Sequence, residues 1–408
     1  MQLLHSATRN YSWGSRTLIP HLQGQPDADK PIAELWFGAH PGDPSTVDGR
    51  LLNEVIAEDP AGQLGSRVSA EYGERLPFLL KVLAAEEPLS LQAHPSKSQA
   101  EEGFARENAS GIELTASNRN YKDDNHKPEL IVALTDFYAM AGFRPLAQTR
   151  ELFAALGCPE LDHYVAMLDD DPSAATESAN LRVLFTTWIT IPSAKRKELI
   201  GAIIAAGERL ISADADDWKS RVMSTVLDLN QRYPGDIGVL GALLLNHIEL
   251  SPGEAVYLDA GQLHAYVSGL GVEIMANSDN VLRGGLTPKF VDVPELVKVL
   301  TYAAEEPRVQ QQDKSAQDNV HEAAAWSYPV PIDEFLLDRV ELTGSSSVDL
   351  DYDGPSIALC TAGSVTLTDA AGETVTATPG QAVWLPASED LVTAAAESDS
   401  ADLFVARA

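Results

Sequence analysis

The sequence predicts a mainly β fold with an α-helical insertion, and three observations support that prediction. First, residues 1–145 carry short apolar runs, such as Leu76–Leu83 and Leu130–Leu134, between Gly- and Pro-rich turn clusters. Second, apolar residues recur at three- and four-residue spacing over residues 146–236, which is typical of amphipathic helices. Third, short apolar strands and turns return from residue 237 onward.

Composition and charge exclude several classes of protein. The chain has 408 residues, with 60 acidic against 29 basic side chains and a formal net charge of −31. Such an excess repels phosphate backbones and anionic lipids, so we expect neither a nucleic-acid nor a membrane partner. No stretch reaches the ~20 apolar residues that span a bilayer. With only Cys158 and Cys360, and no secretory signal pattern at the start, we expect a reduced, cytoplasmic setting.

Two helical regions follow from local signals. The first is one helix over Ser96–Asn108, directly after Pro95, with Ser98 and Glu101 at capping-box spacing. The second is the block at 146–236, which we interpret as a helical domain inserted into a β domain made of residues 1–145 and 237–304. A further short helix is expected over Pro294–Tyr302.

The last quarter of the chain, residues 305–408, is expected to form a separate β domain. It carries 19 Asp and Glu against 4 Lys and Arg. Its Pro379–Ala387 matches Pro252–Ala260 at six of nine positions, which suggests two related β-sandwich modules, although a Gly turn followed by an apolar strand also recurs by chance. Twelve residues after the proline stands His264 in the first copy and Leu391 in the second.

Four side chains are candidate metal ligands. Alternation along Leu89–Pro95 places Ser90, Gln92 and His94 on one strand face, although a polar strand face is usually only solvated. His264 follows a Gly turn, where a ligand, a proton shuttle and a hydrogen-bonded core residue are all common. Glu129 follows Pro128 at the mouth of an apolar strand, or simply ends a charged surface loop. Together, Gln92, His94, Glu129 and His264 would give zinc two imidazole nitrogens and two oxygens.

A polar segment, Val272–Phe290, is the longest unusual stretch of the sequence. It carries Arg283 and Lys289 within an acidic protein and contains adjacent glycines. A turn-rich surface loop is the simpler interpretation. The functional interpretation is a basic loop that exposes its backbone over a site for an anion.

The sequence strongly resembles the type I mannose-6-phosphate isomerases, or phosphomannose isomerases, of the cupin superfamily. The motifs that carry the resemblance span most of residues 1–305 in order. They are Asn10-Tyr11-Ser12-Trp13-Gly14, Ala33-Glu34-Leu35-Trp36-Phe37-Gly38, Gln92-Ala93-His94-Pro95, His126-Lys127-Pro128-Glu129, His264-Ala265-Tyr266 and Asn277–Phe290. Several long motifs in the same order make chance similarity improbable.

The resemblance implies a cupin-type jelly-roll catalytic domain, a helical domain and a C-terminal β-sandwich of degenerate cupin type. It implies one zinc ion per chain, a small phosphorylated sugar as substrate, and interconversion of mannose 6-phosphate and fructose 6-phosphate; we expect a monomer. The family's site residues fall on the following positions: Gln92, His94, Glu129 and His264 for zinc; Arg283, Glu273 and Lys127 for catalysis; Ser90, Lys81 and Lys289 for substrate.

The reaction must move a proton between neighbouring carbons through an enediolate. We expect Glu273 to act in that transfer, Arg283 to steady the enediolate oxygens and Lys127 to assist. The phosphate requires a local positive pocket, drawn from Lys81, Lys127, Arg283, Lys289 and the zinc, because the net charge opposes steering of an anion.

Two other functions remain open on the sequence. A non-haem iron oxygenase on the same scaffold would also use two His and a carboxylate, but Gln92 and the basic segment disfavour it. A sugar-phosphate-binding regulator would keep the pocket and lose catalysis, which the intact set of candidate residues disfavours.

Overall fold

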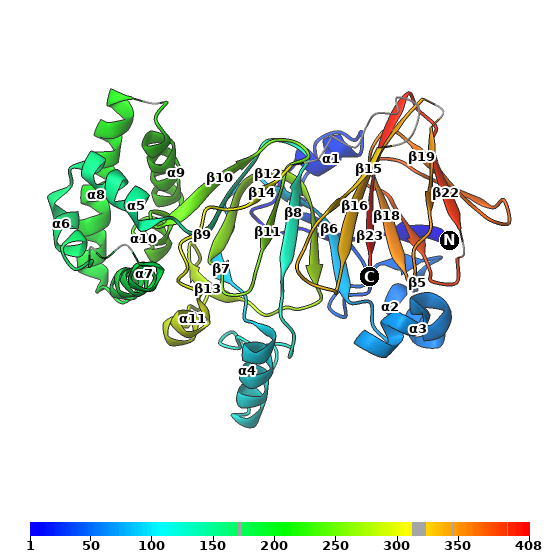
Figure 1. Ribbon diagram of the computed structural model, residues 1–408, viewed down its shortest axis with the longest axis horizontal. Helices are drawn as coiled ribbons and strands as arrows, with labels where there is room; N and C mark the ends of the chain where they lie inside the picture. Colours follow the sequence, from blue (N-terminus) through cyan, green and yellow to red (C-terminus); the bar gives the residue numbers. More distant parts are fainter. Residues whose placement is uncertain (170, 172, 215, 312–323, 345, 390) are drawn as a thin grey trace.

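The computed structural model describes residues 1–169, 171, 173–214, 216–311, 324–344, 346–389 and 391–408. Within these ranges the chain forms three β-sheets, a block of helices at one end and several smaller helices (Figure 1). No helix in the described ranges is long and apolar enough to cross a membrane. The combination of β-sheets with a block of helices is as predicted, but the described residues hold about as much helix as strand, so the fold is mixed rather than mainly β.

The largest sheet has eleven strands, and its long strand β12 joins two arms. β12 pairs with β9 and β7 through its first residues and with β6 and β8 from Gly269 onward. The strands are β2 (Ala7–Arg9), β3 (Glu34–Phe37), β6 (Phe78–Ala85), β7 (Leu91–Ala93), β8 (Glu129–Ala133), β9 (Phe137–Phe143), β10 (Leu245–Leu250), β11 (Ala255–Leu258), β12 (His264–Ala276), β13 (Leu282–Gly285) and β14 (Val309–Gln310).

Gly269 allows β12 to pass from one arm to the other. Its φ is +125°, and a Cβ there would lie 2.7 Å from the Phe137 ring and 2.8 Å from the Asp136 carbonyl oxygen. A register shift between Tyr266 and Ser268 precedes it. A bulge and a glycine together let a strand bend sharply, so the two arms can face each other. Apolar side chains from both arms, including Ile131 from β8, form one buried cluster between them.

The other two sheets form a sandwich built mainly from carboxyl-terminal strands, drawn from gold to red in Figure 1, with three amino-terminal strands in blue. Apolar side chains of both sheets fill the space between them. The eight-stranded sheet contains β15 (Ala324–Tyr328), β16 (Leu336–Thr343), β23 (Ser400–Arg407), β18 (Ser356–Ala362), β21 (Ala382–Leu385), β1 (Gln2–His5), β4 (Thr46–Val47) and β5 (Arg50–Leu51). The four-stranded sheet contains β17 (Ser347–Leu350), β22 (Val392–Ala396), β19 (Val365–Asp369) and β20 (Thr374–Ala377).

The first strand of the chain pairs with one of the last. Leu3 in β1 lies opposite Val383 in β21, so the amino-terminal residues complete the carboxyl-terminal sheet. The sequence did not indicate this pairing. The other face of that sheet packs on the eleven-stranded sheet through a shared apolar cluster that includes Trp384 and Val82. The two short repeats form β11 and β21, each after a glycine with positive φ, Gly253 and Gly380.

The helical prediction for residues 146–236 is confirmed. The helices there are α5 (Leu146–Leu156), α6 (Pro159–Val165), α7 (Ala174–Ile189), α8 (Ser193–Ala213) and α9 (Trp218–Arg232), followed by α10 (Ile237–Ala242). They lie together in green at one end of the molecule (Figure 1). Their buried faces share one apolar cluster with β7, β9 and β13, so the helical block rests directly on the sheet that carries β7.

The remaining helices are short or peripheral: α1 (Leu18–Leu22), α2 (Leu52–Glu58), α3 (Pro60–Tyr72), α4 (Lys97–Ala109) and α11 (Val293–Val299). The last confirms the short helix expected near Pro294. The capping box predicted from Ser98 and Glu101 is wrong: Ser96 caps α4, accepting from the Gln99 backbone, while the Gln99 side chain accepts from the Ser96 backbone. The N-cap is therefore Ser96, whose backbone is extended, two residues before Ser98, and the helix itself lies one residue later than predicted at each end.

The predicted loop over Val272–Phe290 is also wrong in part. Residues up to Ala276 belong to β12, and Leu282–Gly285 form β13, which pairs with β7. Apolar residues on both faces of this segment are buried against neighbouring sheets, which the polar composition concealed. Only the short connection at 277–281 and the residues after Gly285 lie outside strands.

Candidate active site

Three buried side chains converge where β7, β8 and β12 approach one another. His94 follows the end of β7, Glu129 opens β8 and His264 opens β12. Glu129 Oε2 lies 3.5 Å from His94 Nε2 and 3.3 Å from His264 Nε2. All three atoms are buried without a hydrogen-bond partner among the described residues. Their potential ligand atoms lie within 4.8 Å of one another, so the group can hold a metal ion.

The opposite ring nitrogens explain which atoms face the centre. His94 Nδ1 lies 2.7 Å from the Asn280 carbonyl oxygen, and His264 Nδ1 lies 2.9 Å from the Gln262 carbonyl oxygen. Each Nδ1–H donates to a carbonyl, so each neutral ring presents an unprotonated Nε2 to the centre. Burial lowers the pKa of His94 to about 4, which keeps its ring neutral at neutral pH. This is the donor set that divalent zinc prefers.

A lysine holds the carboxylate of the group ionised. Lys127 Nζ lies 3.1 Å from Glu129 Oε1, the oxygen that points away from the two histidines. Burial alone would raise the pKa of Glu129, but the Lys127 charge and the histidines hold it well below its ordinary value. One oxygen is therefore bound to the lysine, and the other is left for a metal.

Gln92 and Arg283 lie beside this group in register. Gln92 in β7 is directly opposite His264 in β12 on one side and opposite Arg283 in β13 on the other. Directly opposed residues of antiparallel strands project to the same face. Strand pairing thus places the Gln92 side chain on the same face as His264. Arg283 is half-buried, and only burial shifts its pKa, downward.

A second buried cluster surrounds Glu273 in the same strand, β12. Its Oε2 lies 2.7 Å from Lys81 Nζ, and its Oε1 accepts a 2.8 Å hydrogen bond from the Tyr266 hydroxyl. Lys81 lies opposite Glu273 across the β6–β12 pair, and its Nζ is also 3.7 Å from Glu34 Oε1. The Trp36 indole donates to the other oxygen of Glu34. The charged and polar groups of this cluster are thus paired with one another through ion pairs and hydrogen bonds.

The two clusters lie within electrostatic range of each other. Burial, with smaller contributions from the Glu129 and Glu34 charges, raises the pKa of Glu273 above its ordinary value despite the Lys81 ammonium. Burial alone would lower the pKa of Lys81, but its carboxylate neighbours, Glu273 first, raise it. The Tyr266 ring centroid lies 6.3 Å from that of His264. Glu273 is therefore a carboxylate with an elevated pKa beside a metal-binding group.

Cations gather on the exposed side of the site. Lys289 is exposed after β13, and its pKa is lowered by partial burial and then by the charges of Arg283 and Lys122. Lys122 and Lys127 both lower the pKa of Asp279, after its hydrogen bond to His40. Mutual repulsion among these side chains marks a local positive region in a protein whose net charge is −31.

Comparison with known proteins places the chain in a family. Residues 1–146 match the family model described as phosphomannose isomerase type I, catalytic domain. The chain is 36% identical to the mannose-6-phosphate isomerase of Escherichia coli strain K12 over 401 residues, which cover 96% of each chain. The chain belongs to the type I mannose-6-phosphate isomerases.

Other members of the mannose-6-phosphate isomerase family agree with this assignment. The human mannose-6-phosphate isomerase is 34% identical over 389 residues, covering 89% of this chain and 87% of its own. A crystal structure of the Salmonella typhimurium mannose 6-phosphate isomerase, bound to fructose 6-phosphate and zinc, superposes with a TM-score of 0.86 at 34% identity. That likeness covers 100% of this chain and 99% of the other.

In the present chain, a member of the mannose-6-phosphate isomerase family, the structure brings most of the predicted site residues together. Strand register and short contacts unite Gln92, His94, Glu129, His264, Lys127 and Arg283, and a separate ion pair joins Lys81 to Glu273. Ser90 lies just before β7, two residues from Gln92. Lys289 lies on the exposed side.

Four residues of the site were not singled out for a role from the sequence: Glu34, Trp36, Tyr266 and Lys122. Tyr266 stands two residues after His264, so strand alternation could have placed it on the same face. Lys122 precedes an acidic pair in a mixed-charge loop and gave no comparable signal.

Proposed function

We propose that this chain is a zinc-dependent aldose-ketose isomerase that interconverts mannose 6-phosphate and fructose 6-phosphate through an enediolate. The observation that supports it is the convergence of three buried, unpartnered ligand atoms with a cationic region in an acidic protein. Zinc and fructose 6-phosphate are bound in the Salmonella typhimurium relative, which supports the same ligands here.

In this proposal Gln92, His94, Glu129 and His264 hold one zinc ion. The neutral amide of Gln92 leaves only Glu129 as an anionic ligand, so the bound ion retains much of its positive charge. When bound, zinc would supply a Lewis acid that favours negative charge on the sugar oxygens. Lys127 holds Glu129 in place through its other oxygen.

Glu273 carries the proton between the two carbons. Its elevated pKa brings the carboxyl group closer to neutral pH, where a group can both accept and return a proton. Lys81 and Tyr266 fix the orientation of its two oxygens. Arg283, a half-buried cation next to Gln92 in register, steadies the enediolate oxygens, and Lys127 assists.

The phosphate binds at the exposed cationic side. Lys289 and Arg283 provide charge, and Ser90 provides a hydroxyl close to the metal ligands in sequence. Lys122 extends the same region. A cluster of cations of this kind recognises a dianion locally, whatever the overall charge of the protein.

We also propose the domain layout. Two facing arms that share one long strand are consistent with a jelly roll of cupin type, formed by residues 1–145 and 237–304. Residues 146–236 form the inserted helical domain, and residues 305–408 the C-terminal β-sandwich. Expression of residues 305–408 alone would test whether the C-terminal sandwich is an independent domain. That fragment lacks β1, which pairs with β21 in the full chain.

A coupled assay of mannose 6-phosphate conversion tests the function. Purified protein is assayed as isolated, after chelation, and after zinc is added back, with metal content measured in each sample. We expect activity to disappear with the metal and to return with zinc. Activity that is unchanged after chelation would exclude a requirement for the metal. A zinc-loaded protein that binds the sugar phosphate without converting it would favour a regulatory function over an enzyme.

A further inference from the structure

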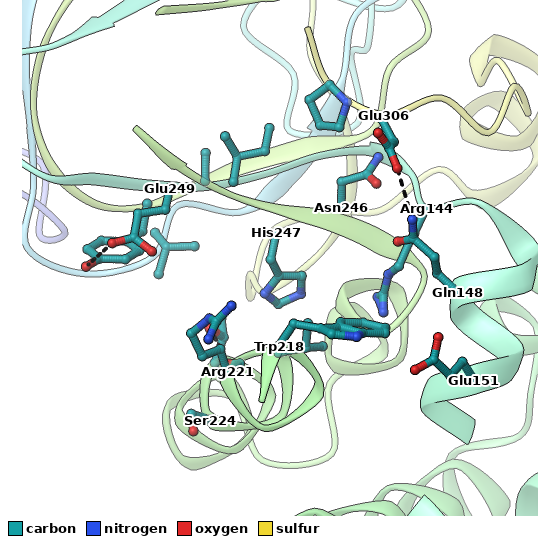
Figure 2. Close-up of a pocket in the computed structure, with 17 residues that line it drawn as sticks. Arg144, Gln148, Glu151, Trp218, Arg221, Ser224, Asn246, His247, Glu249 and Glu306 are labelled. Carbon is teal, nitrogen blue, oxygen red and sulfur yellow. Dashed lines mark hydrogen bonds between the residues drawn. The ribbon is translucent and has the colours of Figure 1, made fainter. Parts of the chain in front are cut away.

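A second cavity lies between the helical block and the sheet beneath it. Its volume is about 760 Å³, and it is lined by β9, β10, α5 and α9 together with the segment that joins β9 to α5. None of its lining residues belongs to the site described above. Figure 2 shows Arg144, His247 and Trp218 facing this space from three different elements. The volume falls within the range of small-molecule sites in proteins.

Arg144 is the chemically unusual residue of this cavity. It is 2% exposed, and its Nη2 donates to the carbonyl oxygens of Leu243 at 2.7 Å and Leu245 at 2.9 Å. Its Nη1 is buried without a hydrogen-bond partner among the described residues. Burial lowers the pKa of Arg144 to about 10, so it is still a cation at neutral pH. A buried charge without a counter-ion is costly and normally has a partner.

The acidic side chains around the cavity are bound to other groups. Glu151 accepts from Lys219 at 2.8 Å, and Glu306 accepts from Gln148 at 3.0 Å. Glu249 accepts from the Tyr138 hydroxyl at 3.3 Å. No ion pair joins Arg144 to a carboxylate within the described ranges, and burial is the only influence that shifts its pKa. Its charge is therefore not neutralised by the protein around it.

The side chains next to Arg144 add no negative charge to the cavity wall. His247 Nε2 lies 3.0 Å from the Ala242 carbonyl oxygen, and burial and the Arg144 charge lower the pKa of His247 to about 4. The Arg144 guanidinium lies over the Trp218 ring, 5.5 Å from its centroid. Arg221, on the exposed face of α9, adds a second guanidinium to the cavity wall.

We propose that this cavity binds a small oxyanion, a phosphate or carboxylate group of a metabolite, whose oxygens pair with the free Nη1 of Arg144. An oxyanion supplies both elements missing at this position, a negative charge and an acceptor for a buried N–H. Phosphate monoesters and small carboxylates share this chemistry. Because the cavity is lined by α5 and α9, its occupant would bridge the helical block and the sheet.

Trp218 provides a local reporter for the test. The chain has six tryptophans, so fluorotryptophan-labelled, zinc-loaded protein gives a fluorine NMR spectrum in which Trp218→Phe assigns one resonance. Inorganic phosphate and malonate are titrated separately at constant ionic strength. We expect the Trp218 resonance to shift and saturate with at least one salt. A response to phosphate alone, to malonate alone or to both identifies the class of oxyanion.

Two variants test the position of binding. Arg144→Gln should weaken the affinity reported by Trp218 roughly tenfold or more, because it removes a charged hydrogen bond. Ser224→Glu adds a carboxylate to the exposed cavity wall on α9 and should weaken it in the same direction, even if Arg144→Gln does not fold. Ser212→Glu is the matched control: Ser212 on α8 makes the same type of bond to the carbonyl four residues back and lies outside the cavity.

The proposal is wrong if the Trp218 resonance stays in place through both the phosphate titration and the malonate titration. It is equally wrong if Ser224→Glu and Ser212→Glu give the same affinity as the parent. Either result would mean that Arg144 only ties the Leu243 and Leu245 carbonyls to the sheet.

Discussion

Glu129 Oε2 and His264 Nε2 face each other at 3.3 Å, both buried and neither with a hydrogen-bond partner in the described part of the chain. His264 donates through Nδ1 to the Gln262 carbonyl, so the Nε2 of the neutral ring would offer a lone pair to an oxygen that also offers lone pairs. Two acceptors in contact repel unless a cation lies between them. This arrangement supports a metal more directly than residue identity alone.

Zinc should therefore stabilise the fold through Glu129. At free zinc about 100 times the Kd, binding adds about 2.7 kcal/mol, which raises the apparent Tm of a chain of this length by roughly 3 °C. Glu129→Gln should abolish most of this response in differential scanning fluorimetry. Glu107→Gln is the control, because Glu107 is also a buried carboxylate but bonds to backbone N–H groups of Asn120 and Tyr121. An equal zinc response in both variants would contradict the assignment.

Asn280 should act as a positioning residue for the metal. Its carbonyl orients His94, and its fully buried side chain joins two loops, accepting from Lys122 N at 2.7 Å and donating to Asn125 O at 2.9 Å. Asn280→Ala should weaken zinc affinity about 10–100-fold, with activity recovered at saturating zinc. Metal-competition titration measures the change. Asn180→Ala, which removes a comparable loop contact in the helical block, should leave zinc affinity unaltered.

Glu273→Gln should lower kcat roughly 10²–10⁴-fold while zinc content stays constant, because the variant cannot accept a proton. The measurement combines turnover with deuterium exchange at C2 followed by NMR. Tyr266→Phe, which removes the hydrogen bond to Glu273, should have a smaller effect in the same direction. Glu107→Gln is the control, since Glu107 is a buried carboxylate that bonds to backbone N–H groups outside the site. Near-normal turnover and exchange in Glu273→Gln would rule out this base.

Lys289→Ala should act mainly on KM. Loss of one charged contact to the phosphate should raise KM roughly 10-fold, with little change in kcat or zinc content. In the parent enzyme, KM should also rise with ionic strength because this part of the site is exposed to salt. Lys195→Ala removes an exposed helical lysine that pairs with Glu198 and should leave KM unchanged. A kcat effect in Lys289→Ala without a KM effect would contradict a phosphate contact.

Acid should destabilise the fold partly through His247. Its pKa is lowered from 6.5 to about 4, so between these values the unfolded chain binds a proton that the folded chain does not. The free energy of unfolding therefore falls as pH falls through this range, by up to roughly 3 kcal/mol. His247→Gln, which can keep the bond to the Ala242 carbonyl, should lose less stability over the same range. Urea unfolding at a series of pH values compares the two proteins, and identical losses would contradict the prediction.

Local pattern was sufficient for much of the fold. The apolar runs at Leu76–Leu83 and Leu130–Leu134 became β6 and β8, and three- and four-residue spacing predicted the helices after residue 146. Prediction failed where burial on both faces hid a strand, as in β12 and β13, and where the cap of α4 depended on the extended conformation of Ser96. These features depend on neighbours that no local window contains.

The sequence by itself determined which residues have suitable chemistry: imidazoles, a carboxylate and an amide that can bind zinc, and cations that can bind phosphate. Only the tertiary structure decided which of them meet. β7 pairs with the first residue of β12 and β8 with its last residues, and the facing of these two arms brings His94, Glu129 and His264 together, while burial leaves their facing atoms unpartnered. The same register joins Lys81 to Glu273. Residue type sets the intrinsic chemistry of a side chain, whereas its charge state and partners depend on packing between distant segments.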